Sequence, residues 1–401
     1  MIIIGFDWAR NKHNLCVMRK NGDIIFEQVV KHDGEALNEL KQRIAELEPN
    51  SASVHVALEQ HDGALLAWLL DTGYTVYAIN PKSADRARDI FRPAGAKDDA
   101  GDARIAADLL RNNLERYRPM YAQSDDTLHL RSLSRLQKRV TEQKTALMQQ
   151  LRTLLAEWSP QLSKLCNDFN RKWQRCLIRQ FPLHEDLVAA HGNKVNSVLA
   201  GHRLSKATRE KVLSVRNAEP VFVPAGRKAA LRTEINFIIE LLDQYIEKLV
   251  VLEQDITEAF ISHPCFETFN SLPVKGVSTL AAIASSFGDR RENPTGWRQL
   301  AACWGVAPVT YASGKTCSVR RRKACDSFAL QAFSDFSFAS SFSVTGCWAS
   351  DFYERKRSEG HDHHEAIRAV GLRWVKVMWK IWHDGTIYDE QIHQKRKCQN
   401  R

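Results

Sequence analysis

Residues 2–26 read IIIGFDWARNKHNLCVMRKNGDIIF and predict the order of the first elements. Three apolar runs, Ile2–Asp7, Asn14–Met18 and Ile24–Phe26, have the length and composition of short β-strands. The Asn21-Gly22 step between the second and third runs is a strong hairpin signal, because both residue types tolerate the positive φ of a tight turn. This stretch therefore predicts three strands in succession.

The next segment alternates between helical and strand patterns. Leu37, Leu40, Ile44 and Leu47 recur at helical spacing within residues 34–47. A strand, a helix, a strand and a helix are then expected at residues 53–58, 63–71, 74–79 and 98–113, with Asn80-Pro81 closing the second of these strands. This order predicts a mixed sheet with helices on its faces.

The middle of the chain has two long helical patterns. The second keeps an unbroken 4-3-4-3 spacing from Leu231 to Ala259, and the first runs through Leu133, Leu136, Val140, Leu147, Leu151 and Leu154. Heptad spacing is typical of a coiled coil. We expect a coiled-coil arm within one chain or between chains, with a packed helical bundle as the alternative. Helical fragments follow at residues 264–385, so the predicted fold class is α/β plus α.

The composition limits the class of protein. The chain has 401 residues, 44% of them hydrophobic, which is enough for more than one core. No apolar run reaches the roughly 18 residues of a membrane span, and the first residues lack a secretory pattern. Nine cysteines without a C-x-x-C pair favour reduced thiols. We therefore expect a cytoplasmic protein with no membrane partner.

The charge is distributed unevenly. The net charge is +10, yet residues 1–120 carry 16 basic and 18 acidic side chains, whereas residues 262–401 carry 20 and 13. A basic surface favours a polyanionic partner. Nucleic acid would then be held mainly by the later regions, which leaves the early carboxylates for another purpose, such as holding a metal ion. Uneven surface charge without a function is the alternative.

Four carboxylates lie at positions that the predicted fold could bring together. Asp7 ends the first predicted strand, Glu59 ends the fourth, and Asp99 and Asp102 share one face of a predicted helix. If the first and fourth strands are neighbours, the four acids can converge and would repel each other unless divalent cations neutralise them. Oxygen ligands suit Mg²⁺ or Mn²⁺. The alternative is a strand-end turn residue and a solvated helix start.

Four motifs resemble a known family: GFDWARNKHNLCV, LEQHDG, the Asn80-Pro81 step and KDDAGDARIAADLL. They resemble the RuvC-like, RNase-H-fold domain of the DEDD transposases of the insertion-sequence-one-ten family, the recombinases guided by a bridge RNA. Lys97, Asp99, Asp102 and Ala103 fit the family motif K-x-D-x-x-D-A. The resemblance implies that Asp7, Glu59, Asp99 and Asp102 form a catalytic, metal-binding quartet with Mg²⁺ or Mn²⁺ as the cofactor. The sequence Gln60-His61-Asp62-Gly63 departs from the family's usual small residue or Thr before Gly.

Residues 272–326 resemble the C-terminal domain of the same family. The matching motifs, in order, are Gly276, Gln299-Leu300-Ala301, Gly305, Pro308 and Ser313-Gly314, while Val274-Lys275 replaces the usual Pro-Gly. The resemblance implies that Ser313 is the nucleophile and forms a covalent phosphoserine link to DNA.

The residues around Ser313 are compatible with that role. Gly314 allows close approach of the backbone to a ligand. A serine hydroxyl needs an activating base or metal, and because no local His-Asp pair is present, the acidic quartet is the expected source. The basic residues that follow are expected to bind phosphates: Lys315, Arg320, Arg321, Arg322 and Lys323. A structural loop is the alternative.

The resemblance implies four segments: a RuvC-like metal-binding domain at 1–122, a helical coiled-coil region at 123–262, a transposase domain with the serine at 263–390, and a basic tail at 391–401. It implies a transposase that cuts and rejoins the donor and target DNA of an insertion sequence, as a dimer or tetramer with a bridge RNA, at the nucleoid of a bacterial cell. Two alternatives remain open. One is a metal-dependent RuvC-like resolvase or nuclease with a structural serine, and the other is a non-catalytic nucleic-acid-binding coiled-coil protein.

Two other groups are expected to be structural. His361, His363 and His364 lie beside Glu365 without a second ligand cluster, which favours a helix start over a metal site. Trp374, Met378, Trp379 and Trp382 have helical spacing and are predicted to lie in a core.

Overall fold

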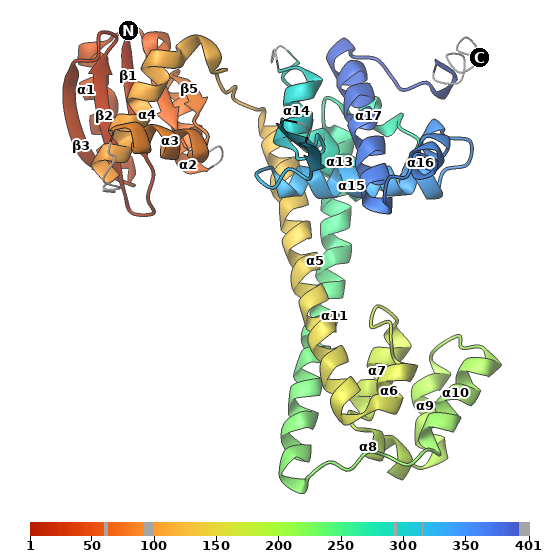
Figure 1. The fold of residues 1–401 in the computed structure, drawn as a ribbon. Coiled ribbons are helices and arrows are strands. Elements are labelled where there is room, and N and C mark those ends of the chain that lie inside the picture. Colours follow the sequence, from red (N-terminus) through yellow and green to blue (C-terminus); the bar gives the residue numbers. More distant parts are fainter. Residues whose placement is uncertain (60–62, 92–98, 292–294, 315, 393–401) are drawn as a thin grey trace. The chain divides into compact units, whose positions relative to one another are not determined.

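The computed structural model describes residues 1–59, 63–91, 99–291, 295–314 and 316–392 (Figure 1). The chain forms two compact units, Met1–Gln123 and Ser124–Arg401, so the predicted middle and C-terminal regions share one unit. Within the described ranges, no helix is both long and apolar enough to cross a membrane. The predicted basic tail lies outside the described residues from residue 393 onward.

The first unit is built on a five-stranded sheet in the order β3-β2-β1-β4-β5. β1 pairs antiparallel with β2 and parallel with β4, so the condition on which the four acids could converge, neighbouring first and fourth strands, is met. The strands are β1 (Ile2–Asp7), β2 (Lys12–Arg19), β3 (Ile24–Lys31), β4 (Val54–Leu58) and β5 (Thr75–Ala78).

Helices cover both faces of this sheet. Side chains alternate along a strand, so Ile2, Ile4 and Phe6 pack in the core that includes α1 (Gly34–Leu47) and α2 (Ala64–Asp71). Ile3 faces the other way, into a core formed with α4 (Asp99–Asn113). Two short 3₁₀ helices, η1 (Ser51–Ser53) and η2 (Leu114–Arg116), complete the unit.

One helix of this unit was not predicted. The Asn80-Pro81 step ends the preceding strand, as expected, but it also begins α3 (Pro81–Phe91). Proline suits the first helical position because its missing N–H would have no partner there. The Asn80 side chain accepts a hydrogen bond from the Lys82 N–H at 2.9 Å, which supports the helix start.

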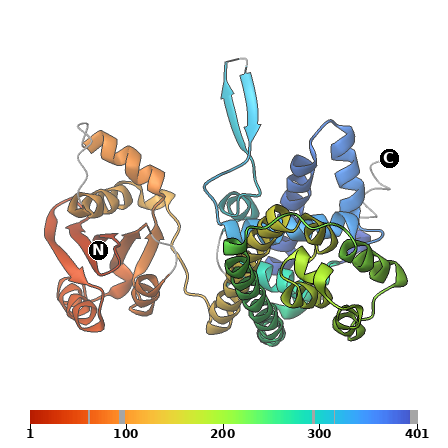
Figure 2. The same cartoon turned by 90° about the horizontal axis from the view of Figure 1, so that it is seen from below.

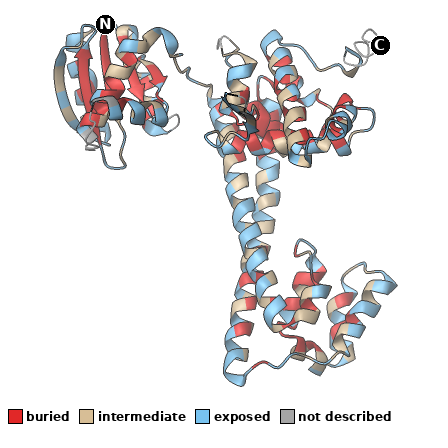
Figure 3. Ribbon diagram, in the orientation of Figure 1, coloured by how far each residue is buried: buried red, intermediate tan, exposed pale blue. Residues whose placement is uncertain are grey.

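The two long helices of the second unit pack against each other within one chain. They are α5 (Asp125–Trp158) and α11 (Ala225–Ser262), which lie side by side in Figure 1. Near one end Leu151, Leu155, Leu231 and Ile235 share a buried core. The middle of the pair is mostly exposed or half-buried (Figure 3). A pairing inside the chain means that subunit contact is not needed to bury these apolar residues.

The region between the long helices folds into short helices, which the sequence pattern did not reveal. These are α6 (Pro160–Leu165), α7 (Lys172–Gln180), α8 (His184–Ala189), α9 (Gly192–Ala200) and α10 (Lys206–Arg216).

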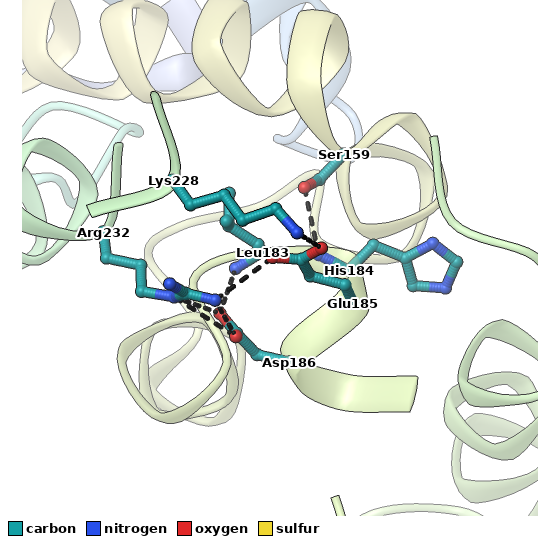
Figure 4. Close-up of polar contacts among 7 residues, drawn as sticks. All are labelled: Ser159, Leu183, His184, Glu185, Asp186, Lys228 and Arg232. Atoms are coloured by element: carbon teal, nitrogen blue, oxygen red, sulfur yellow. Dashed lines mark hydrogen bonds and ion pairs between the residues drawn. The ribbon is translucent and has the colours of Figure 1, made fainter. Parts of the chain in front are cut away.

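Ion pairs join α8 to α11 (Figure 4). Lys228 Nζ lies 2.6 Å from a carboxylate oxygen of Glu185, and Arg232 donates to Asp186 Oδ1 at 2.6 Å. The backbone N–H of His184 donates to Ser159 Oγ at 3.1 Å. The two acids lie in the first turn of α8, where the helix dipole favours negative charge.

The remaining helices surround a large core that is rich in aromatic side chains. Its buried residues are among those coloured red in Figure 3. Trp374, Met378 and Trp382 are buried and Trp379 is half-buried, which confirms the predicted core residues. The helices are α12 (Phe266–Asn270), α13 (Val277–Phe287), α14 (Trp297–Cys303), α15 (Ser327–Phe342), α16 (Trp348–Ser358) and α17 (His363–Asp384).

The histidine-rich segment is a helix start, as predicted. Asp362 is the N-cap of α17, and its carboxylate accepts the Glu365 N–H at 2.7 Å. The Glu365 carboxylate in turn accepts from the Asp362 N–H at 3.4 Å, which completes a capping box. His363 bonds the Tyr353 hydroxyl at 2.8 Å.

Candidate active site

Asp7 and Glu59 come at the ends of two neighbouring parallel strands. Phe6 of β1 pairs with Leu58 of the parallel strand β4. Asp7 directly follows Phe6, and Glu59 directly follows Leu58. Two positions earlier, Gly5 pairs with Ala57, and Ala57 lies in the core under α4. Since side chains alternate between the faces, positions 7 and 59 continue the row on the α4 face. The sheet therefore brings these two predicted site residues to one edge.

The helix α4 packs directly on β1 at Gly5. A Cβ atom at residue 5 would lie 2.6 Å from the Ala107 nitrogen and would overlap the Ala103 carbonyl oxygen. The other end of α4 lies at the opposite edge, because the Arg111 side chain reaches Gly22 in the turn between β2 and β3. The helix therefore runs antiparallel to β1. Its first turn, which contains Asp102, lies at the edge where Asp7 and Glu59 are found.

Asp102 is held by an arginine that sequence reasoning missed. Arg88 of α3 donates from Nε to Asp102 Oδ1 at 2.8 Å and from Nη1 to Asp85 at 2.7 Å. The Asp102 and Arg88 side chains are 15% and 19% exposed. The hydrogen bond that Arg88 donates to Asp102 raises the pKa of Arg88, so its guanidinium stays charged. No local pattern connects the two residues, which belong to different helices.

The acids fit a divalent cation by their chemistry. Carboxylate oxygens are the ligands that Mg²⁺ and Mn²⁺ prefer. Among the described residues, no three His, Cys, Asp or Glu side chains are grouped closely enough to hold an ion. Residue 99 begins α4, but the Asp99 side chain lies outside the described part of the structure. An ion bound to Asp7, Glu59 and Asp102 together would compete with Arg88 for the negative charge of the Asp102 carboxylate, one oxygen of which Arg88 already occupies.

A buried histidine pair lies on the neighbouring strand. His13 precedes Asn14, the partner of Asp7 in the β1–β2 register, and its side chain is fully buried. Its Nε2 lies 2.8 Å from Nδ1 of His32. Burial, with a smaller contribution from His32, lowers the pKa of His13 to about 4. His13 is therefore neutral at physiological pH, and nothing in the linear sequence indicated its burial.

Ser313 is the last residue of a strand in an exposed hairpin. The sequence predicted a turn here, but the strands β6 (Val309–Ser313) and β7 (Thr316–Arg320) were missed. They form a two-stranded sheet that stands out from the helices of its own unit (Figure 2). Ser313 pairs with Thr316, and Gly314 takes a φ of +56°, a value that favours glycine. The fold therefore presents the Ser313 side chain to solvent.

The predicted basic residues follow this hairpin. Arg320, Arg321 and Lys323 are exposed, and Arg322 is half-buried with its Nε buried and unpaired among the described residues. Arg321 lines a groove of about 920 Å³ between α5, α13, α15 and α17. Lys315 lies outside the described residues. The accessible guanidinium and ammonium groups at the base of the hairpin can bind phosphates.

Two family models match the chain. Residues 4–160 match a model of the IS110 DEDD transposases, and residues 267–354 match the model described as "Transposase IS116/IS110/IS902 family". Together they cover more than half of the chain. All four predicted acids fall in the first range, and Ser313 and the basic residues fall in the second.

Two relatives align along almost the whole chain. The "Mini-circle putative transposase for IS117" of Streptomyces coelicolor is 26% identical over 404 residues, covering 97% of this chain and 96% of the relative. The "Insertion element IS110 uncharacterized 43.6 kDa protein" of the same organism is 22% identical, covering 98% and 96%. With both models and these alignments in agreement, the chain belongs to the IS110/IS116/IS902 family of transposases.

Proposed function

We propose that this transposase cuts and rejoins DNA strands through a phosphoserine intermediate formed at Ser313. The observation that carries the proposal is the position of Ser313: it is exposed, at the end of β6, next to a glycine with positive φ and ahead of a basic run. A nucleophile in a backbone that can approach a phosphate closely, with cations at the base of the same hairpin for the adjoining DNA backbone, fits attack on a phosphodiester.

The chemical step is a transesterification. The Ser313 hydroxyl loses its proton as Oγ bonds to phosphorus, and the bond from phosphorus to the leaving deoxyribose oxygen breaks. That oxygen takes up a proton and becomes a free hydroxyl. In the reverse sense, a deoxyribose hydroxyl of another strand attacks the phosphoserine, and Ser313 recovers its proton. The number of phosphate ester bonds is unchanged, so the reaction needs no energy source.

The proposed metal ligands are Asp7, Glu59, Asp99 and Asp102. The position of Asp7, Glu59 and Asp102 at one sheet edge supports this assignment. A bound Mg²⁺ or Mn²⁺ would stabilise negative charge on a phosphate and lower the pKa of an attacking hydroxyl. The chain's own contribution is to hold the carboxylates together, and Arg88 neutralises Asp102 while no ion is bound.

The proposed partners are donor and target DNA, a bridge RNA from the element, and further copies of the chain in a dimer or tetramer. The basic run after β7 supports contact with nucleic acid. Base pairing by a guide would supply sequence selection, so the protein would need mainly backbone contacts.

The test uses the full chain with labelled element-end DNA, Mg²⁺ and the element's transcripts. On a denaturing gel, we expect a DNA-linked form of the protein that requires metal and transcripts. Mass spectrometry of that adduct should place the modification on the peptide containing Ser313. Strand cleavage without any adduct would instead favour the resolvase-type nuclease.

A further inference from the structure

The hairpin that holds Ser313 has two unequal faces. In an antiparallel pair, residues opposite each other project to the same face. Tyr311 pairs with Ser318 and Val309 pairs with Arg320, so residues 309, 311 and 313 share one face with residues 318 and 320. Val319 pairs with Thr310 and belongs to the opposite face. Tyr311 therefore lies on the Ser313 face, two residues before the serine.

Tyr311 and Arg320 form a pair on this face. The Arg320 guanidinium carbon lies 5.3 Å from the centroid of the Tyr311 ring, within the range of a cation–π interaction. The two residues are diagonal neighbours across the strands. Because the guanidinium rests on the ring, Arg320 is held on the same side of the hairpin as Ser313.

This pair is unusually accessible for an aromatic contact. Tyr311 is 57% exposed. A two-stranded hairpin without a core is marginally stable in water, so its aromatic residue gains little from the fold itself. An exposed ring beside a fixed guanidinium offers a stacking surface for a nucleobase and a fork for a phosphate.

We infer that Tyr311 and Arg320 position the nucleotide at the phosphate that Ser313 attacks. The Tyr311 ring stacks on the neighbouring base, and Arg320, which pairs with Val309 at the base of the hairpin, binds a phosphate farther along the same DNA strand. Both are positioning residues, and the inference rests on the proposed role of Ser313. The bound nucleotide must have a base with an accessible face, because the Tyr311 ring cannot stack on a base whose faces are covered by neighbouring bases.

The first experiment measures adduct formation in a single turnover over a range of element-end DNA concentrations. Tyr311→Ala should lower the rate at saturating DNA by roughly 10- to 100-fold, the cost of a reacting phosphate that is no longer held in position. The DNA concentration at half-saturation should change less than about twofold, since many other contacts hold the DNA. Tyr311→Phe keeps the ring and should react at the wild-type rate. Arg320→Lys keeps the charge but loses the two-pronged guanidinium, so its rate should lie between those of the wild type and Tyr311→Ala.

Val319→Ala is the matched control. Val319 is 59% exposed on the other face of the same hairpin, so its loss tests for general damage to the strands. It should leave the saturating rate unchanged. Equal losses in Val319→Ala and Tyr311→Ala would show that Tyr311 only supports the hairpin, and a wild-type rate in Tyr311→Ala would also overturn the inference.

A second measurement does not depend on the chemical step. In a Ser313→Ala background, 2-aminopurine is placed on either side of the cleaved phosphate, and its fluorescence is recorded on binding. Stacking should quench one of the two probes, and Tyr311→Ala but not Tyr311→Phe should remove that quenching. If wild-type protein forms no adduct, the proposed function fails, while this quenching still decides the role of Tyr311. Equal fluorescence in the presence of the proteins with Tyr311 and with Tyr311→Ala would show that Tyr311 does not stack on either base.

Discussion

Arg88 and Asp102 form an ion pair between α3 and α4, with 2.8 Å between Nε and Oδ1. Both side chains are mostly shielded from water, so each compensates the charge of the other. Because Asp102 is also a proposed metal ligand, Arg88 competes with the ion for the same carboxylate.

Removing Arg88 should therefore tighten metal binding. We expect Arg88→Met to lower the dissociation constant for Mn²⁺ by roughly fivefold, the factor given by about 1 kcal/mol of ion-pair energy. Calorimetric titration of the full chain measures this constant. Arg86→Met, an exposed residue of the same helix, removes the same charge and should have a smaller effect. Weaker Mn²⁺ binding in Arg88→Met would show that Arg88 supports the site instead.

The acids should be needed for metal binding but not for folding. Asp7→Asn, Glu59→Gln, Asp99→Asn and Asp102→Asn should each abolish strand cleavage. In wild-type protein, Mn²⁺ at about 100 times its dissociation constant should stabilise the fold by about 2.7 kcal/mol. Thermal unfolding should show this rise in Tm for the wild type and for Asp71→Asn, an exposed control in the same unit. A full rise in the site variants would exclude these residues as ligands.

The contact between β1 and α4 should tolerate no side chain at residue 5. In Gly5→Ala the new methyl group overlaps the Ala103 carbonyl group, so the helix must move away from the strand. We expect a loss of roughly 3 kcal/mol in stability, at the upper end for overpacking. Gly34→Ala, where no atom lies within 4 Å of the added carbon, should change stability by less than about 1 kcal/mol. Urea unfolding compares the two, and equal midpoints would contradict the close packing.

Protonation of His13 should destabilise the first unit in acid. The folded-state pKa is lowered to about 4 from an ordinary value near 6.5. The unfolded chain therefore binds the proton more readily, and stability is complete above pH 6.5 and falls as the pH drops toward 4. The loss reaches about 3 kcal/mol. Hydrogen exchange of the β2 amides, corrected for the intrinsic rate, should show it. His13→Leu should remove most of this pH dependence, and an unchanged slope in that variant would assign it to other groups.

Much of the first unit could be predicted because its strands are buried and its helices amphipathic. Apolar runs such as Ile2–Asp7 and the spacing of Leu37, Leu40 and Ile44 directly reflect burial in the structure. The strand ends at Asp7 and Glu59 could be predicted, whereas their neighbouring positions were only a condition that the pairing of β1 with β4 fulfils. Asn80-Pro81 was interpreted only as a strand end, because a proline in the first turn of a helix and one after a strand look alike locally.

The remaining elements and side-chain contacts could not be predicted, because they depend on tertiary structure. The short helices α6 to α10 contain too few turns for a clear period. In β6, residues 310–313 are all exposed, so this strand lacks the alternation of a half-buried strand. The pairs Arg88–Asp102 and His13–His32 join residues from separate elements. No single-sequence pattern encodes such contacts. The role of Ser313 came from the resemblance to a family, since a Ser-Gly step alone is ordinary turn chemistry.

The cleavage activity of the Ser313→Ala variant decides whether Ser313 is the nucleophile. The substitution removes one exposed oxygen atom, so the fold and nucleic-acid binding should be unchanged. Wild-type and variant protein are incubated with end-labelled element DNA, Mg²⁺ and transcripts, and the products are separated on a denaturing gel. We predict that the variant gives neither covalent adduct nor cleaved strand. Cleavage of the DNA by Ser313→Ala at the wild-type rate would contradict the account, because the nucleophile would then be water.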